Sequence, residues 1–280
     1  SVEEFVEFVR FLAECLECRD SFEEEFQLVT LYYEVMDEFN IEVPSIEYAA
    51  YQTLSPDYQM FKTSLDIAEA SKDENVTKFA SELEGRVDDI NAEVAAIRLE
   101  AQHEKLLREN SDFDEVLEIT EALSVKIKDV RERADIIRNY QKLFNVPQNR
   151  FEELSACMEE IELKHGLWES LKTWGQLMLK WAIMQFDHID VADLEEKVSK
   201  YNKMVLRIER GLPPNKVLPI LREKVFEFKE TLPVIVNLRN PMLKQRHWDK
   251  VNEAMNTVIV NDESFTLGLL VSLRVIEYKE

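Results

Sequence analysis

The sequence has 280 residues and a formal net charge of −22, from 34 Lys and Arg against 56 Asp and Glu. We expect neither nucleic acid nor membrane as a partner, because both are bound chiefly by Lys and Arg that neutralise phosphates. Glycine accounts for only 5 residues, although about 7% of residues is ordinary. Because hairpins and phosphate-binding loops depend on glycine, this composition predicts an all-α protein.

The acidic charge is concentrated at the start of the chain. Residues 1–50 hold 14 acidic and 2 basic residues, whereas residues 166–280 hold 16 and 17. Proline is also uneven, since none lies between Pro56 and Pro147. We therefore predict two domains: an acidic, tail-like helical region over 1–145 and a helical bundle over 146–280.

In chain order, the first helix is predicted from Ser1 and Glu4, which have the spacing of a capping box. A second helix is expected to start at Asp20 or Ser21, and a third to run from Ser45 to Leu54 and stop at Pro56. The opening residues contain neither Met nor a signal peptide, so we expect a piece of a larger protein.

The clearest periodic pattern lies at about 76–144. Two series of mostly apolar residues recur there at alternating intervals of mostly 3 and 4, which is the spacing of a coiled-coil seam. A polar stretch at 109–112 separates them, so we expect an elongated antiparallel hairpin with arms of roughly 50 Å. The series are Phe79, Leu83, Val87, Ile90, Val94, Ile97 and Ala101, then Val116, Thr120, Leu123, Ile127, Val130, Ala134 and Ile137.

The second half is predicted to contain shorter helices, at about 149–164, 167–186, 190–210, 214–231, 242–259 and 263–279. Strand is the minority interpretation for residues 234–236 and 258–260, because neither run alternates in polarity.

Two Glu-x-x-His pairs, Glu100 with His103 and Glu162 with His165, have the spacing found in di-iron carboxylate bundles. A solvated position explains the first pair, and His165 before Gly166 is typical of a helix C-terminus. We therefore predict no metal site, and keep the di-iron bundle as a remote alternative.

Cys15 and Cys18 form a lone C-x-x-C flanked by glutamates, without the positive charge that lowers a thiol pKa. With Cys157 the number of cysteines is odd, which favours reduced thiols in an intracellular compartment. No two glycines are separated by four residues, so a P-loop is absent from the sequence. We predict that this chain has no catalytic residue and binds no cofactor.

All four tryptophans lie in the second half. Trp168, Trp174 and Trp181 are spaced by 6 and 7 residues, and Trp248 follows later. Such spacing on a helix favours burial in a helix-on-helix layer, with a docking surface as the second interpretation.

These tryptophans belong to an ordered set of motifs that resembles dynein heavy chains. The set is Leu167-Trp-Glu-Ser170, Trp174, Trp181, Leu212-Pro-Pro-Asn-Lys-Val217, Thr231-Leu-Pro-Val-Ile-Val236, Leu238-Arg-Asn-Pro241, Leu243-Lys244 and Arg246-His-Trp248. Upstream, Leu143-Phe-Asn-Val-Pro147 is similar to the family's stretch before the linker, except that Asn145 stands where many axonemal members have Gly. The match is good over about 150–280 and loose over 1–145.

The resemblance implies a non-catalytic tail and linker fragment of an axonemal dynein heavy chain, whose linker moves across the AAA+ ring of a microtubule motor. ATP and Mg would be bound C-terminal to residue 280, and microtubules only by a distant stalk. The implied partners are the motor ring and other dynein subunits, the intermediate and light chains, in the ciliary or flagellar axoneme of the cytoskeleton. The implied signature residues are Trp168, Trp174, Trp181, Leu232, Pro233, Asn240, Pro241, Arg246, His247 and Trp248.

Without that resemblance, the same helices would also suit a generic helical adaptor or tether that carries a coiled-coil hairpin. The two hypotheses make the same predictions up to residue 166, so only the second half distinguishes them.

Overall fold

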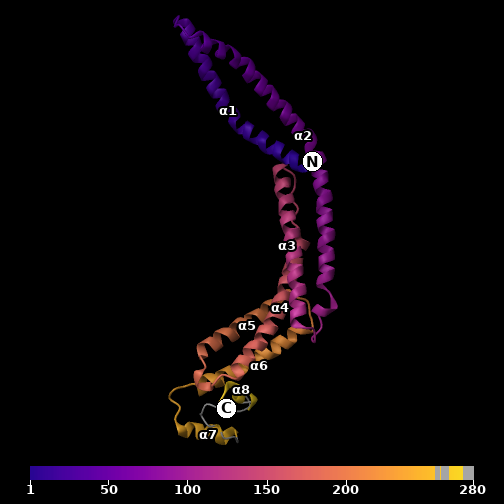
Figure 1. Cartoon of the computed structure of the whole chain (residues 1–280), viewed down its shortest axis with the longest axis vertical. Helices are drawn as coiled ribbons and strands as arrows, with labels where there is room; N and C mark the ends of the chain where they lie inside the picture. Colours follow the sequence, from indigo (N-terminus) through magenta and orange to yellow (C-terminus); the bar gives the residue numbers. More distant parts are fainter. Residues whose placement is uncertain (256–258, 260–264, 274–280) are drawn as a thin grey trace. The chain divides into compact units, whose positions relative to one another are not determined.

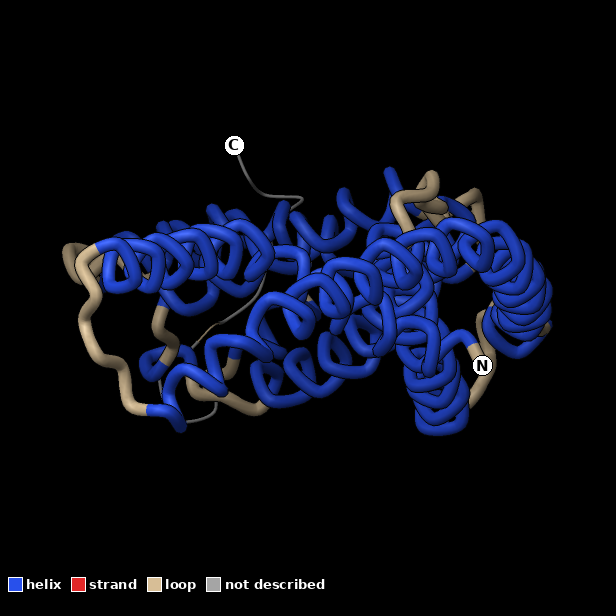
Figure 2. The backbone as a smooth tube through the Cα atoms, turned by 90° about the horizontal axis from the view of Figure 1, so that it is seen from above, coloured by secondary structure: helices blue, strands red, loops and turns tan. Residues whose placement is uncertain are grey.

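The structure is a computed structural model that describes residues 1–255, 259 and 265–273. Within these residues the chain is all-α, as predicted, with loops only between helices (Figure 2). The α-helices are α1 (Val2–Glu38), α2 (Ser45–Ala101), α3 (Phe113–Leu143), α4 (Glu152–Ala182), α5 (Val191–Gly211), α6 (Val217–Leu238), α7 (Gln245–Met255) and α8 (Leu267–Ser272). None of them is both long and apolar enough to cross a membrane.

The chain divides into two compact units, which are described separately. The first unit contains residues 1–93 and 130–151, and the second contains residues 94–129 and 152–280. Helices α2 and α3 therefore contribute to both units. The predicted boundary at 145/146 stays a prediction.

In the first unit, α1 and the first part of α2 run antiparallel (Figure 1). Their ring contacts keep a constant register, from Tyr33 against Tyr51 (3.9 Å between centroids) to Phe5 against Phe79 (4.4 Å). The start of α1 is fixed by the predicted capping box, in which the Glu4 N–H donates to Ser1 Oγ at 3.3 Å.

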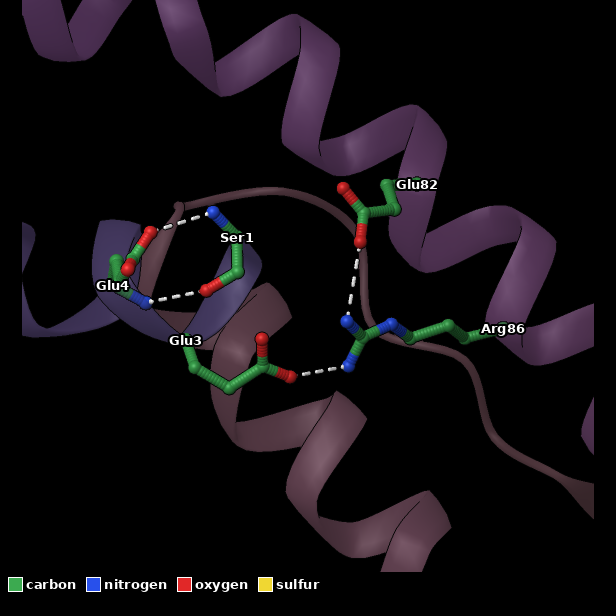
Figure 3. A network of polar contacts seen from close by, with 5 residues as sticks. All are labelled: Ser1, Glu3, Glu4, Glu82 and Arg86. Atoms are coloured by element: carbon green, nitrogen blue, oxygen red, sulfur yellow. Dashed lines mark hydrogen bonds and ion pairs between the residues drawn. The ribbon is translucent and has the colours of Figure 1, made fainter.

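An ion pair from α2 adds to the anchorage of α1 at the same place (Figure 3). Arg86 reaches Glu3 at 2.7 Å and Glu82 at 3.1 Å. The hydrogen bond from Arg86 lowers the pKa of Glu3 to about 2. The stability that Glu3 contributes is therefore present above its ordinary pKa of 4.5 and is lost as the pH falls toward 2, because the unfolded chain binds the proton first.

Two predicted helix ends in this unit are wrong. No break occurs at Asp20 or Ser21, because α1 continues to Glu38, and α2 continues through Pro56. Proline removes a helical hydrogen bond and costs about 3 kcal/mol in a helix interior. Here ring contacts on both sides of Pro56 hold α2 against α1, namely Tyr51 with Tyr33 before it and Tyr58 with Phe26 after it.

The coiled-coil seams are confirmed. Every residue of the two series is buried except Phe79, which is half-buried. The antiparallel register is visible in each unit separately, because Arg133 pairs with Glu93 (2.7 Å) in the first and Lys126 pairs with Glu100 (2.7 Å) in the second. In an antiparallel pair one residue number rises as the other falls, so the two numbers of each contact have a constant sum, as they do for these two pairs.

The end of α3 explains the one departure from the dynein pattern noted in the sequence. Asn145 adopts a left-handed backbone with φ of 55°, a conformation that Gly and Asn tolerate better than other residues. The Val146 N–H then donates to the Gln141 carbonyl at 3.0 Å and closes the helix end. Asn145 therefore serves the same backbone role as a glycine.

In the second unit, α5 packs on α4 and α6, and α8 packs on α4. The predicted break at His165 and Gly166 is wrong, because α4 is continuous from Glu152 to Ala182. Residues 234–236 are helical and not strand, because α6 continues past Pro233 to Leu238, so the predicted helix end at about 231 is wrong. Residues 258 and 260, and residues 263, 264 and 274–279 of the predicted helix at 263–279, lie outside the described residues.

Candidate functional site on helix α4

Helix α4 carries the first three predicted signature residues, Trp168, Trp174 and Trp181. Its sequence places Gly166 and Gly175 in the helix interior, where an added Cβ would meet nothing within 4 Å among the described residues. Its buried positions are mostly leucines and tryptophans, together with Cys157, Ile161, Ser170 and one lysine, Lys164. The helix is covered on two sides, by the end of the hairpin and by α5 and α6.

The side of α4 toward the hairpin end is held by polar groups. Lys164 is only 6% exposed, and its Nζ donates to the Ala101 carbonyl and to Glu160 Oε1, both at 2.7 Å. Trp168 donates from Nε1 to the Leu106 carbonyl at 3.2 Å. Ala101 is the last residue of α2, so the Lys164 ammonium satisfies a helix-end carbonyl where positive charge is favoured.

A second polar contact lies one residue further along α4. His165 Nδ1 and Thr120 Oγ1 share a hydrogen bond of 2.9 Å, and the Thr120 hydroxyl also contacts the Val116 carbonyl at 3.0 Å. Thr120 is a fully buried member of the α3 seam. The sequence-based assignment of His165 to a solvated helix end is therefore wrong: His165 satisfies a buried hydroxyl instead.

The other side of α4 forms an aromatic core with α5 and α6. Trp174 lies edge-on to Trp181 (6.0 Å between centroids) and to Tyr201 of α5 (4.9 Å). Trp181 stacks on Phe228 of α6 at 4.9 Å with an interplanar angle of 22°. Both tryptophans are 3% exposed or less. Aromatic pairs of this geometry each contribute about 1 kcal/mol beyond the area they bury.

The later signature residues are not part of that core. Trp248 is buried and lies edge-on to Phe265 at 5.8 Å, whereas Pro233, Asn240, Pro241 and Arg246 are exposed. Leu232 and His247 are half-buried. Local hydrogen bonds shape this segment, from the Met242 N–H to Asn240 Oδ1 and from the Lys244 N–H to His247 Nδ1, both at 2.9 Å.

A tight backbone contact joins α8 to the end of α4. A Cβ added to Gly268 would lie 2.6 Å from the Ala182 carbonyl oxygen, closer than real Cβ contacts. Next to it, the Leu267 N–H donates to the Met184 carbonyl at 3.1 Å and the Phe186 N–H to the Phe265 carbonyl at 2.9 Å. Glycine is therefore required at this position for backbone to approach backbone.

The residues considered for metal binding are engaged in other contacts. Glu100 pairs with Lys126 at 2.7 Å, Glu162 with Arg207 at 3.4 Å, and His103 Nδ1 accepts from the Lys105 N–H at 3.2 Å. In the part of the chain that the structure describes, no group of three His, Cys, Asp or Glu side chains is arranged to hold a metal ion. In these contacts, Glu100, Glu162 and His103 form ion pairs or a hydrogen bond within the protein.

The three cysteines are free thiols. Cys18 is exposed and Cys15 half-buried, whereas Cys157 is fully buried and its pKa is raised by burial. A thiol with a raised pKa is a poor nucleophile at neutral pH.

Sequence reasoning missed Lys164 and Thr120 as polar members of the interface between α4 and the hairpin. A signal was present for Lys164, because it continues the buried series Cys157, Ile161 and Trp168 at helical spacing and follows Glu160 by four residues. A charged residue inside an apolar stripe is expected where its side chain satisfies a buried polar group, here the carbonyl at the end of α2. The contact of Arg239 with Asp187 (3.3 Å) and with the ring of Phe186 left no comparable pattern.

Comparison with known proteins identifies the kind of chain to which this core belongs. Residues 154–280 match the family described as dynein heavy chain, N-terminal region 2. The chain is 34% identical over 276 residues to dynein axonemal heavy chain 6 of Homo sapiens, which covers 98% of the chain and 7% of that relative. It is 24% identical over 281 residues to the dynein-1-beta heavy chain, flagellar inner arm I1 complex, of Chlamydomonas reinhardtii, covering 100% of the chain and 6% of the relative.

The class that the fold and core define, over the described residues, is thus an all-helical segment with a buried aromatic core. More particularly, the chain corresponds to an N-terminal segment of a dynein heavy chain and is related to the axonemal members, which confirms the resemblance seen from Leu167 to Trp248. The chain spans only about 7% or less of the length of these relatives.

Proposed function

We propose that this segment is a non-catalytic mechanical part of an axonemal dynein heavy chain, in which residues from about 146 onward begin the linker. In this proposal the linker moves across the AAA+ ring of the parent protein and transmits the stroke. ATP and Mg are bound elsewhere in the parent, which acts as a microtubule-motor ATPase in the ciliary or flagellar axoneme. Its partners are the parent's own ring and the other dynein subunits.

The observation that supports this role most directly is the aromatic core of α4, α5 and α6. Trp174 and Trp181 are fully enclosed and contact rings from both neighbouring helices. A close-packed core of this kind transmits strain because its side chains have no free volume into which to move. A lever depends on that property, whereas a tether depends only on its length.

The experiment follows from this difference and uses the parent heavy chain with its motor domain. Trp181→Ala removes the stacking on Phe228 and leaves a cavity in the core, and its matched control is Leu179→Ala, since Leu179 lies on the same helix with 73% of its surface exposed. We expect Trp181→Ala to slow microtubule gliding several-fold while ATP turnover is retained, and the control to glide at the wild-type rate.

Trp181→Phe, which keeps an aromatic ring in place, should glide faster than Trp181→Ala. This second variant separates a loss of stiffness from a failure to fold. Wild-type gliding by Trp181→Ala would contradict the lever and favour the tether, as would an equal slowing by Leu179→Ala.

A further inference from the structure

The end of α1, in the first unit, carries an apolar stripe that no element among the described residues covers. This outer stripe consists of Leu28, Leu31, Tyr32, Val35 and Phe39, each between 40% and 69% exposed. Intervals of 3, 4, 7 and 11 from Leu28 place all five on one side of a helix. Single exposed leucines are ordinary, but a contiguous apolar stripe of this length marks an interaction surface.

The opposite side of α1 already packs on α2, so the outer stripe is a second apolar face. Phe26 stacks on Tyr58 at 4.5 Å and Tyr33 on Tyr51 at 3.9 Å, which accounts for the first face. Among residues 13–64, only Tyr58 is buried. This pair of helices therefore buries little apolar surface of its own, although most helical stability in proteins comes from tertiary packing of an apolar face.

The charge around the outer stripe has a single sign. Residues 20–61 contain ten Asp and Glu and no Lys, Arg or His. Glu24 and Glu25 lie one turn before Leu28, and Glu38 lies one turn after Val35, so carboxylates flank the apolar residues at both ends. The outer stripe thus has an apolar centre and a negative border.

We propose that the outer stripe is the docking site of a basic amphipathic helix from another protein, with apolar residues at heptad positions and Lys or Arg beside them. A helix is the partner that fits, because the stripe has the spacing of a coiled-coil face and the backbone of α1 is already hydrogen-bonded within the helix. Basic side chains would neutralise the carboxylates on either side, which favours this partner over others and speeds its association.

Charge also argues against the other occupants of such a surface. A second copy of the chain would bring two acidic segments together, and like charges across an interface are unfavourable. Anionic lipid is repelled for the same reason. This inference does not depend on the linker role, because it concerns residues 20–61 and is tested on the 280-residue chain without a motor domain.

The probe is a synthetic helix of about three heptads with Leu at positions a and d and Lys at the exposed positions, and its counterpart has Glu in place of Lys. Binding to the chain is measured by titration calorimetry. The variant Leu31→Ser/Val35→Ser removes two apolar groups of the stripe. Its matched control, Leu99→Ser/Val125→Ser, changes residues that are 72% and 60% exposed elsewhere. Net charge is the same in all three proteins, so general attraction between acid and base is held constant.

We expect the Lys helix to bind wild-type chain and the control equally, and to bind Leu31→Ser/Val35→Ser about tenfold more weakly or worse. The Glu helix should not bind. Equal affinity for both variants would overturn the proposal, because the stripe would then contribute nothing beyond charge.

The remaining outcomes identify another occupant and also overturn the proposal. One is a dimer in analytical ultracentrifugation that Leu31→Ser/Val35→Ser abolishes, which would assign the stripe to a second copy of the chain. The other is binding to phosphatidylcholine vesicles that requires the stripe. Circular dichroism of both variants checks that helix content is retained, so that a lost affinity reports on the surface rather than on unfolding.

Discussion

Lys164 provides the sharpest test of how α4 is fastened to the end of the hairpin. We consider the substitution Lys164→Met, which keeps the length of the side chain and removes its ammonium. In the wild-type chain that ammonium donates to the Ala101 carbonyl and to Glu160, and both side chains of the pair are largely enclosed, at 8% and 15% exposed. The substitution therefore leaves a helix-end carbonyl and a carboxylate without this donor.

The expected cost is about 3 kcal/mol in the free energy of unfolding. Removing one partner of a buried ion pair costs roughly 3–5 kcal/mol, and the lower end applies because Arg98 stays 3.6 Å from Glu160. In the double variant Lys164→Met/Glu160→Met no carboxylate is left behind. The Ala101 carbonyl then lacks its donor, while Arg98 keeps its pair with Glu153 (2.7 Å), so the double variant should lose about 1 kcal/mol.

The assay is urea unfolding followed by tryptophan fluorescence. All four tryptophans belong to the second unit, which also contains Lys164, so this signal reports on the unit that the substitution perturbs. The matched control is Lys172→Met, which breaks the more exposed pair of Lys172 with Asp114 on the same helix (33% and 79% exposed). Exposed pairs contribute at most about 1 kcal/mol.

The order of stability should therefore be wild type and Lys172→Met highest, then the double variant, with Lys164→Met lowest. If Lys164→Met were no less stable than Lys172→Met, Lys164 would not be a structural cap. If the double variant were less stable than Lys164→Met, the stranded Glu160 carboxylate would not be the main cost.

Three further outcomes are expected. Gly268→Ala should destabilise the second unit by about 1–3 kcal/mol because the added Cβ meets backbone, whereas Gly175→Ala, with open space, should stabilise α4 by roughly 0.5–1 kcal/mol in the same urea assay. Hydrogen bonds from Tyr58 and Lys62 lower the pKa of Glu23 to about 2, so the stability that Glu23 contributes is present above pH 4.5 and lost as the pH falls toward 2. In the variant Tyr58→Phe, NMR of the carboxyl groups should show the pKa of Glu23 moving up toward 4.5. An unchanged pKa would contradict the contact. Burial should keep Cys157 unreactive toward a thiol reagent until urea unfolds the chain.

The hairpin was predictable because its signal is local. Residues at intervals of 3 and 4 share one helix face whatever else the chain does, and all but Phe79 are buried as the pattern required. Helix ends were less predictable, since α1, α2 and α4 each continue through a predicted stop. A proline or glycine in sequence gives only its intrinsic cost, whereas the opposing free energy comes from contacts with distant residues, such as Phe26 with Tyr58 beyond Pro56.

The same distinction applies to the candidate site. The spacing of Trp174 and Trp181 placed both on one buried face, and the structure encloses them. The partner of His165 could not be predicted, because Thr120 lies 45 residues earlier and its hydroxyl belongs to an otherwise apolar seam. Polar contacts between distant segments depend on the packed fold, and no periodicity in the sequence encodes them.

The composition counts all apolar residues of the chain together, but their burial divides them into two groups, buried residues and exposed residues. In the neutral part, the large side chains Trp168, Trp174 and Trp181 are buried, and the free energy of their burial stabilises the fold itself. In the acidic part, the outer stripe from Leu28 to Phe39 leaves its apolar side chains 40–69% exposed to water beside a border of carboxylates. Exposed apolar side chains contribute favourable free energy only when a partner covers them. The carboxylates beside the stripe favour a partner with basic side chains. The charge difference between the two parts of the sequence therefore distinguishes a region that completes its own core from a region whose second face is available for another helix.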